Sequence, residues 1–79
     1  MRQIFVKDVS DLMFEELPEG AWQVTIPANR NSDAMQESEE HDLVMTLSDD
    51  LREEMLAAGT FYINFMSLLG PPEVVSITR

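Results

Sequence analysis

The sequence predicts an α+β domain in which a single, mostly antiparallel sheet of four to five strands carries one main helix. Several short segments alternate apolar and polar residues with a period of two, which is the pattern of strands with one buried face. Residues 49–58 instead place their apolar residues at helical spacing. The chain has 79 residues and no cysteine, so a small core without disulfides must stabilise it.

The N-terminal part predicts a strand and a short helix. Residues 3–7 alternate, with Ile4 and Val6 on one face. Helical spacing follows, and we expect a short helix over residues 10–17, which Ser10 can cap and in which Asp11 suits the positive first turn. Pro18 ends that helix. The apolar residues at helical spacing are Val9, Leu12, Met13 and Leu17.

A clear strand and a long polar segment come next. In residues 21–27 apolar side chains alternate with glutamine and threonine, and Pro27 ends the strand or places it at an edge. Residues 28–41 are almost entirely polar, and a run of this length is typical of a functional or disordered loop. We therefore expect an acidic mobile loop over residues 28–41. The alternating apolar residues of the strand are Trp22, Val24 and Ile26.

The main helix is predicted after a further strand. Residues 42–47 alternate, with their leucines and Met45 on one face. Ser48 can cap the helix over residues 49–58, and Gly59 fits the position just past its C-terminus. The apolar stripe of this helix, which we expect to be buried, consists of Leu51, Met55 and Ala58.

Two strands complete the chain. Residues 60–66 alternate strongly, and residues 70–72, Gly-Pro-Pro, form a rigid turn. Residues 74–78 then predict a last strand, with Val75 and Ile77 on one face. The side chains of residues 60–66 that we expect to face inward are Phe61, Ile63 and Phe65.

The predicted order is β-α-β-β-α-β-β. A split βαβ arrangement of the ferredoxin-like kind fits this order. An antiparallel sheet with one main helix is the simpler alternative, because the first helix is barely long enough for a parallel crossover. No repeat or linker divides the chain, so residues 1–79 are predicted to form one domain.

The charge of the chain is its most unusual property. Fifteen acidic residues stand against five basic ones, giving a formal charge of −10 and a pI of about 4.1. Such a chain is repelled by nucleic acid and by anionic lipid, and it is attracted to basic protein surfaces. The charge can also serve solubility alone. The lack of cysteine, of a signal-peptide pattern and of a run of about 20 apolar residues favours the cytoplasm, or a host's cytoplasm.

Catalytic motifs are absent from the sequence, and we expect a protein that is not an enzyme. There is no cysteine and one histidine, His41, so nucleophile–base pairs and zinc sites lack their usual residues. Neither the glycine-rich phosphate-binding motifs nor the spacing of an EF-hand loop occurs. We therefore predict no cofactor and no metal. A small enzyme that uses His41 is the less favoured alternative.

Acidic residues in two segments are the candidate partner-binding residues. In residues 49–58, carboxylates stand four positions apart, where like charges destabilise a helix. Carboxylates at this spacing rise by about 6 Å along the helix axis, comparable to the step between neighbouring phosphates. A solvated helix face would show the same pattern. The predicted partner-binding residues are Asp49, Asp50, Glu53 and Glu54, followed by Glu37, Glu39 and Glu40 of the loop.

These features favour a small acidic inhibitor or adaptor that engages a basic, nucleic-acid-binding surface of a partner protein. Phage-encoded inhibitors, including anti-CRISPR proteins and polymerase inhibitors, are similar in size and charge, although no motif in this chain carries that likeness. The alternative is a structural or assembly subunit, which includes the case of a homo-oligomer, and for which the charge serves solubility. It would use a free strand edge or the face of Tyr62, Asn64 and Met66.

Overall fold

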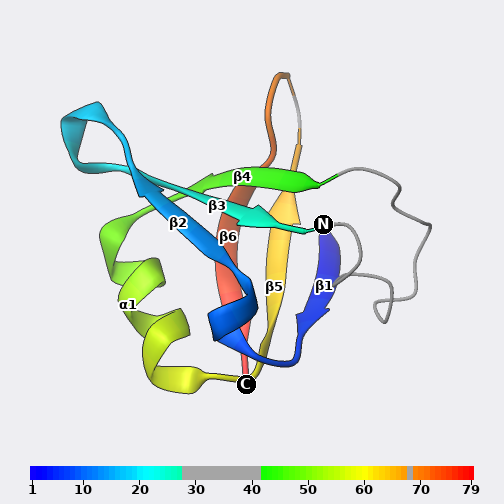
Figure 1. Cartoon of the computed structure of the whole chain (residues 1–79). Helices are drawn as coiled ribbons and strands as arrows, with labels where there is room; N and C mark the ends of the chain where they lie inside the picture. The colour runs from blue at the N-terminus through cyan, green and yellow to red at the C-terminus, as the bar shows by residue number, and fades with distance from the viewer. Residues whose placement is uncertain (28–41, 68) are drawn as a thin grey trace.

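The computed structural model describes residues 1–27, 42–67 and 69–79. In these residues six strands form one sheet, and one α-helix lies against one of its faces (Figure 1). The predicted α+β class is confirmed, with six strands instead of four to five. The predicted acidic loop, residues 28–41, lies outside the described residues. The elements are β1 (Arg2–Val6), η1 (Val9–Asp11), β2 (Met13–Glu16), η2 (Pro18–Gly20), β3 (Trp22–Ile26), β4 (Leu43–Leu47), α1 (Asp49–Ala58), β5 (Phe61–Met66) and β6 (Glu73–Thr78), where η marks a 3-10 helix.

The strand order in the sheet is β1-β5-β6-β4-β3-β2. Every pairing is antiparallel except that of β4 with β6, which is parallel. The predicted ferredoxin-like order is wrong, because β1 and β2 lie at opposite edges of the sheet and only the 3-10 turn η1, not an α-helix, connects them. The prediction of a mostly antiparallel sheet with one main helix is confirmed.

The short helix predicted over residues 10–17 is also wrong. The chain forms the single 3-10 turn η1 and then continues as β2, which pairs with β3. Asp8 rather than Ser10 caps the turn, and its carboxylate accepts hydrogen bonds from the Ser10 backbone N–H at 3.0 Å and hydroxyl at 2.8 Å. Both hydrogen bonds lower the pKa of Asp8, and the one from the Ser10 backbone N–H has the larger effect. A helix of two turns is only marginally stable by itself, whereas β2 gains a ladder of hydrogen bonds with β3.

The core lies between α1 and the face of the sheet that α1 covers, here called the inner face (Figure 1). Each strand contributes alternate residues to it, because successive side chains in a strand point to opposite faces. The inward positions predicted for residues 3–7 and 60–66 are confirmed. The buried apolar residues are Ile4, Val6, Leu12, Val24, Ile26, Met45, Leu47, Met55, Phe61, Ile63, Phe65 and Val74.

A bulge in β6 changes which residues of that strand face the core. Asn64 pairs with Ser76 while the next residue, Phe65, pairs with Val74, so Val75 is an extra residue in β6. One extra residue reverses the alternation that follows it. Val74 and Ile77 therefore pack against the core and Val75 is 43% exposed. The prediction that Val75 and Ile77 share a face is wrong for this reason.

The main helix forms as the sequence predicts. The Ser48 hydroxyl caps its first turn by accepting from the Leu51 N–H at 3.2 Å. At its C-terminus Gly59 adopts φ +78° and donates its N–H to the Met55 carbonyl at 3.0 Å. Of the predicted stripe, Met55 is fully buried, and Leu51 and Ala58 are half-buried. These contacts fix the rotation of α1 against the sheet.

Two adjacent residues of α1 test this rotation. Met55→Ala removes a side chain with no exposed surface, so we expect it to lower the free energy of unfolding by about 3 kcal/mol. Leu56→Ala, at a position that is 48% exposed, is the matched control and should change it by less than about 0.5 kcal/mol. Urea unfolding measured by circular dichroism gives both values. Equal losses in the two variants would contradict the rotation.

Candidate partner-binding surface

The four acidic residues predicted on the main helix lie on its solvent-facing side. Successive residues of an α-helix are rotated by about 100°, so these four positions form one continuous arc opposite Met55. Three of them, Asp50, Glu53 and Glu54, are exposed, and Asp49, at one edge of the arc, is half-buried. The structure therefore brings together the helical half of the predicted partner-binding residues.

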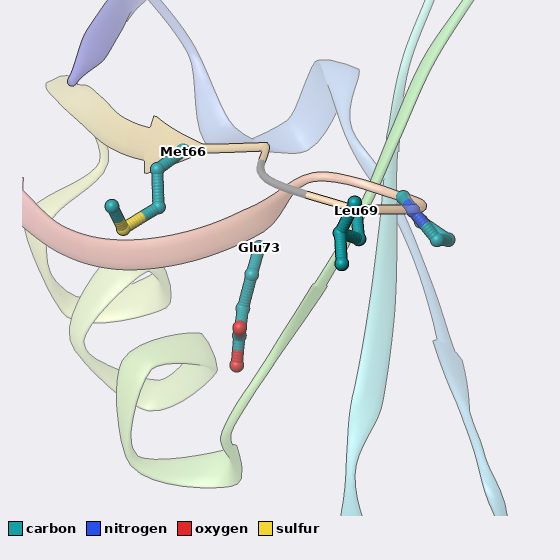
Figure 2. A pocket seen from close by; sticks show the side chains of 4 residues that line it. Met66, Leu69 and Glu73 are labelled. Carbon is teal, nitrogen blue, oxygen red and sulfur yellow. The ribbon is translucent and has the colours of Figure 1, made fainter.

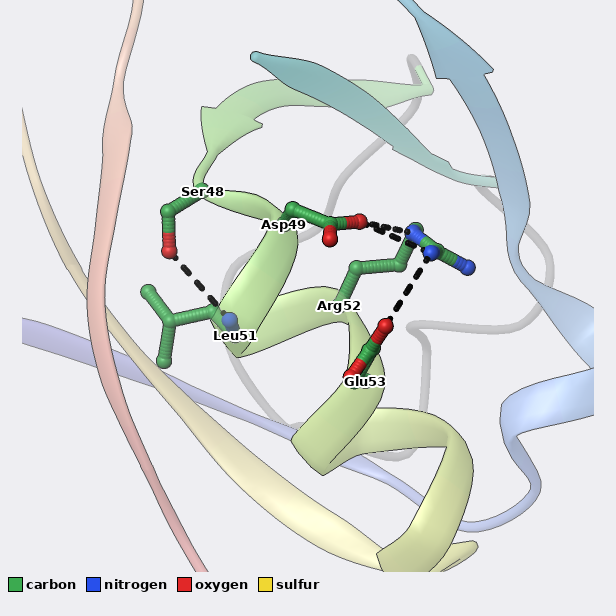
Figure 3. A network of polar contacts seen from close by, with 5 residues as sticks. All are labelled: Ser48, Asp49, Leu51, Arg52 and Glu53. Carbon is green, nitrogen blue, oxygen red and sulfur yellow. Dashed lines mark hydrogen bonds and ion pairs between the residues drawn. The ribbon is translucent and has the colours of Figure 1, made fainter. Parts of the chain in front are cut away.

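Asp49 has a different environment from the other three acids. Its Oδ1 accepts from Nη2 of Arg52 at 2.8 Å and from Nε at 3.1 Å (Figure 3). Glu53 Oε2 is more distant, at 3.9 Å from the same Nη2. A guanidinium that donates two hydrogen bonds to one carboxylate largely neutralises its charge. Asp49 thus positions Arg52, and it is the least available of the four acids for a partner.

Arg52 also connects α1 to the sheet. Its Cζ lies 4.1 Å from the centre of the Trp22 ring, a cation–π contact with the first residue of β3. The Arg52 side chain is only 20% exposed. Since Arg52 is the one basic residue in α1, the positive charge of this helix is turned toward the sheet and away from solvent.

The edge strand β2 places a further carboxylate next to Trp22, the residue on which Arg52 stacks. Glu16 is the direct cross-strand neighbour of Trp22, so the two side chains share the inner face of the sheet on which Arg52 stacks. The sequence alone did not predict a role for Glu16, because residues 10–17 were interpreted as a helix. What places Glu16 beside Trp22 is the pairing of β2 with β3, and only the folded sheet shows this pairing. We define the acidic surface as Asp50, Glu53 and Glu54 of α1 together with Glu16 of β2.

The remaining candidate residues lie elsewhere. Glu37, Glu39 and Glu40, and also His41, lie outside the described residues. Within residues 1–27, 42–67 and 69–79, no group of three or more histidine, cysteine or acidic side chains converges as a metal site would require. In the same residues, no helix has the length and apolar character needed to span a membrane.

The middle of the outer face of the sheet, opposite α1, is uncharged where β1, β5 and β6 lie side by side. Tyr62 and Met66 are exposed there, and the Tyr62 ring lies 5.0 Å from that of Phe5 with the planes at 51°. The Asn64 amide accepts from Gln3 Nε2 at 2.8 Å and donates to the hydroxyls of Ser76 and Thr78, both at 3.0 Å. The polar groups in the middle of this face therefore bond to one another across three strands.

Comparison with protein-family models, with curated proteins and with solved structures gave no match. A functional proposal for this chain therefore rests on the chemistry of these two surfaces.

The contact between Arg52 and Trp22 gives a prediction for stability. Arg52→Met keeps most of the aliphatic stem but removes the cation–π contact and the ion pair with Asp49, so the free energy of unfolding should fall by about 1 kcal/mol. Trp22 is the only tryptophan of the chain, and its fluorescence reports directly on the contact. Arg79→Met, at the exposed C-terminal residue, removes the same charge and should leave stability and fluorescence unchanged. Identical urea midpoints for the two variants would refute the role of Arg52.

Proposed function

We propose that this protein is a small acidic inhibitor or adaptor that binds a basic surface of a partner protein, one that otherwise holds nucleic acid. The observation that supports this proposal most directly is the arrangement of charge on α1. Asp50, Glu53 and Glu54 are exposed, while Arg52 of the same helix is turned toward Trp22. Every charged side chain on the solvent-facing side of the helix is thus negative.

The carboxylates lie on a helix that is fixed before any partner binds. Burial of Met55 and the stacking of Arg52 on Trp22 hold α1 against the sheet, and the Ser48 cap fixes its first turn. A rigid surface loses little conformational entropy on binding, which increases affinity. Asp50 and Glu54 are four positions apart, so their carboxylates are separated by about 6 Å along the axis. A row of this kind can replace phosphates in a cationic groove.

Net charge supports the same proposal from a distance. A chain of −10 is drawn to a cationic groove by long-range attraction, which speeds association and makes it sensitive to salt. Inhibitors of this class compete with nucleic acid for one site, so an added polyanion should displace the protein. Phage-encoded inhibitors of nucleic-acid enzymes are the class with which size and charge agree.

The first experiment identifies the partner by its dependence on salt and on the acidic surface. Tagged protein should retain a nucleic-acid-binding protein from a lysate at low salt and release it at high salt, because screening weakens exposed charge pairs. Asp50→Asn/Glu54→Gln should lose most of that retention, and the charge-conserving Asp50→Glu/Glu54→Asp should keep it. A partner indifferent to salt and to both variants would refute the proposal.

A pair of single substitutions separates the position of a charge from the total charge. Glu54→Gln and Glu15→Gln make the same chemical change at exposed residues, one in α1 and the other in β2 on the outer face. We expect Glu54→Gln to raise the Kd for the captured partner about fivefold, the effect of one exposed ion pair. Glu15→Gln should leave it nearly unchanged. Equal effects would mean that only the net charge matters.

The outer face favours a second candidate function, that of an assembly subunit. The side chains of Gln3, Asn64, Ser76 and Thr78 already satisfy one another, so burying them costs less than burying unpaired polar groups. The Phe5–Tyr62 pair beside them offers an aromatic contact area of the kind that is enriched in interfaces. In this function two copies pack through the uncharged middle of the outer face, and the net charge serves solubility.

Sedimentation analysis distinguishes the two functions. An assembly subunit should form oligomers that persist at high salt, since screening reduces the repulsion between its acidic copies. Tyr62→Glu should then give monomers, and Leu56→Glu, at a similarly exposed apolar position on α1, should not. A monomer under all conditions would exclude this candidate.

A further inference from the structure

A pocket of about 350 Å³ lies at the end of β5 and the turn that leads to β6 (Figure 2). Its volume is at the lower end of the range for sites that bind small molecules or single side chains. Three of the residues that line it are apolar and the fourth is a carboxylate. The lining residues are Met66, Leu69, Pro71 and Glu73.

The two strands and the turn hold these residues in place. Met66 and Glu73 are direct cross-strand partners on the outer face, where β5 and β6 begin to separate. The turn between them is closed by the Ser67 hydroxyl, which donates to the Gly70 carbonyl at 3.1 Å. The turn is attached to β4 by a hydrogen bond of 3.2 Å, which the Thr46 backbone N–H donates to the Pro72 carbonyl. The pocket is therefore formed half by the two strands and half by a turn that is hydrogen-bonded to β4.

The Glu73 carboxylate has no hydrogen bond or ion pair within the described part of the chain. It lies beside the Met66 and Leu69 side chains, which line the same pocket (Figure 2). A side chain that has an aliphatic stem and a cationic end matches this lining, since the stem contacts the apolar walls and the end pairs with the carboxylate. Lysine and arginine have this chemistry.

We propose that this pocket binds a lysine or arginine side chain displayed by the partner protein. The inference rests on the proposed function, which requires a basic partner, and it adds one anchoring residue outside the acidic surface. Charge complementarity supports this occupant, because a protein with a charge of −10 attracts cationic side chains to its exposed carboxylates. At Glu73 the apolar side chains of Met66, Leu69 and Pro71 line the pocket beside the carboxylate. The pocket and the acidic surface lie on different elements, so single variants separate them.

Methyl NMR tests the pocket with a defined probe, Nα-acetyl-lysine methylamide. With ¹³C-methyl-methionine labelling, the Met66 signal should shift and saturate, while the signal of Met13, which is 61% exposed on β2, should not move. The buried Met45 and Met55 signals report whether the fold is intact. The norleucine analogue, which has the same stem without the amine, should cause no comparable shift. An equal shift with norleucine would overturn the proposal in favour of an apolar occupant, and so would the absence of a Met66 shift with the lysine probe.

Substitution of the carboxylate completes the test. Glu73→Gln keeps the shape of the pocket and should raise the Kd of the lysine probe about fivefold, whereas Glu15→Gln on the same face should not change it. An unchanged Kd in Glu73→Gln would refute the pocket. The pocket can fail while the proposed function holds, if Glu54→Gln weakens the captured partner and Glu73→Gln affects neither partner nor probe. If no salt-sensitive partner is captured but the Met66 signal still shifts in a way that depends on Glu73, the proposed function fails and the pocket holds.

Discussion

Burial of Met55 is the contact on which the arrangement of this protein depends. It is the one fully buried side chain of α1, and it packs in the core that the strands of the sheet share. Because a helix has a fixed rotation per residue, directing Met55 inward turns the four acids of α1 outward. In a chain of 79 residues without disulfides, this thin core must supply most of the stability. The same contact that stabilises the fold therefore also orients the acidic surface.

Arg52 shows how the fold distributes charge. Its guanidinium is occupied twice, by the Asp49 carboxylate and by the Trp22 ring, so it joins α1 to β3 while it neutralises one acid. A helix tuned for stability would carry further lysines or arginines among its acids, and this one has none. The excess of carboxylates lowers the stability of the isolated helix and increases its attraction to a basic surface. That combination is typical of residues that serve binding rather than folding.

The two faces of the sheet differ in the kind of contact that they favour. The side with α1 and Glu16 is acidic, whereas the middle of the outer face, across β1, β5 and β6, is uncharged, with its polar side chains hydrogen-bonded to one another. Electrostatic attraction acts over about 10 Å at moderate salt, and packing acts only at contact. Separate faces for the two interactions allow a partner to be attracted by one surface and held by another. The Glu73 pocket combines both kinds of contact within a few residues.

The sequence by itself determined the elements whose signal is local. The capped helix from Ser48 to Gly59 and the alternation of β1, β3, β4 and β5 follow from capping chemistry and from strand periodicity, which neighbours in the chain supply. Only the tertiary structure decided that residues 13–16 form a strand, because pairing with β3 outweighs a weak helical pattern. The bulge at Val75 and the strand order likewise depend on partners far away in the sequence. For the candidate site, the sequence predicted the acids of α1. It could not show that Arg52 forms an ion pair with Asp49 or that Glu16 lies beside Trp22, since both contacts depend on how the helix and the sheet pack.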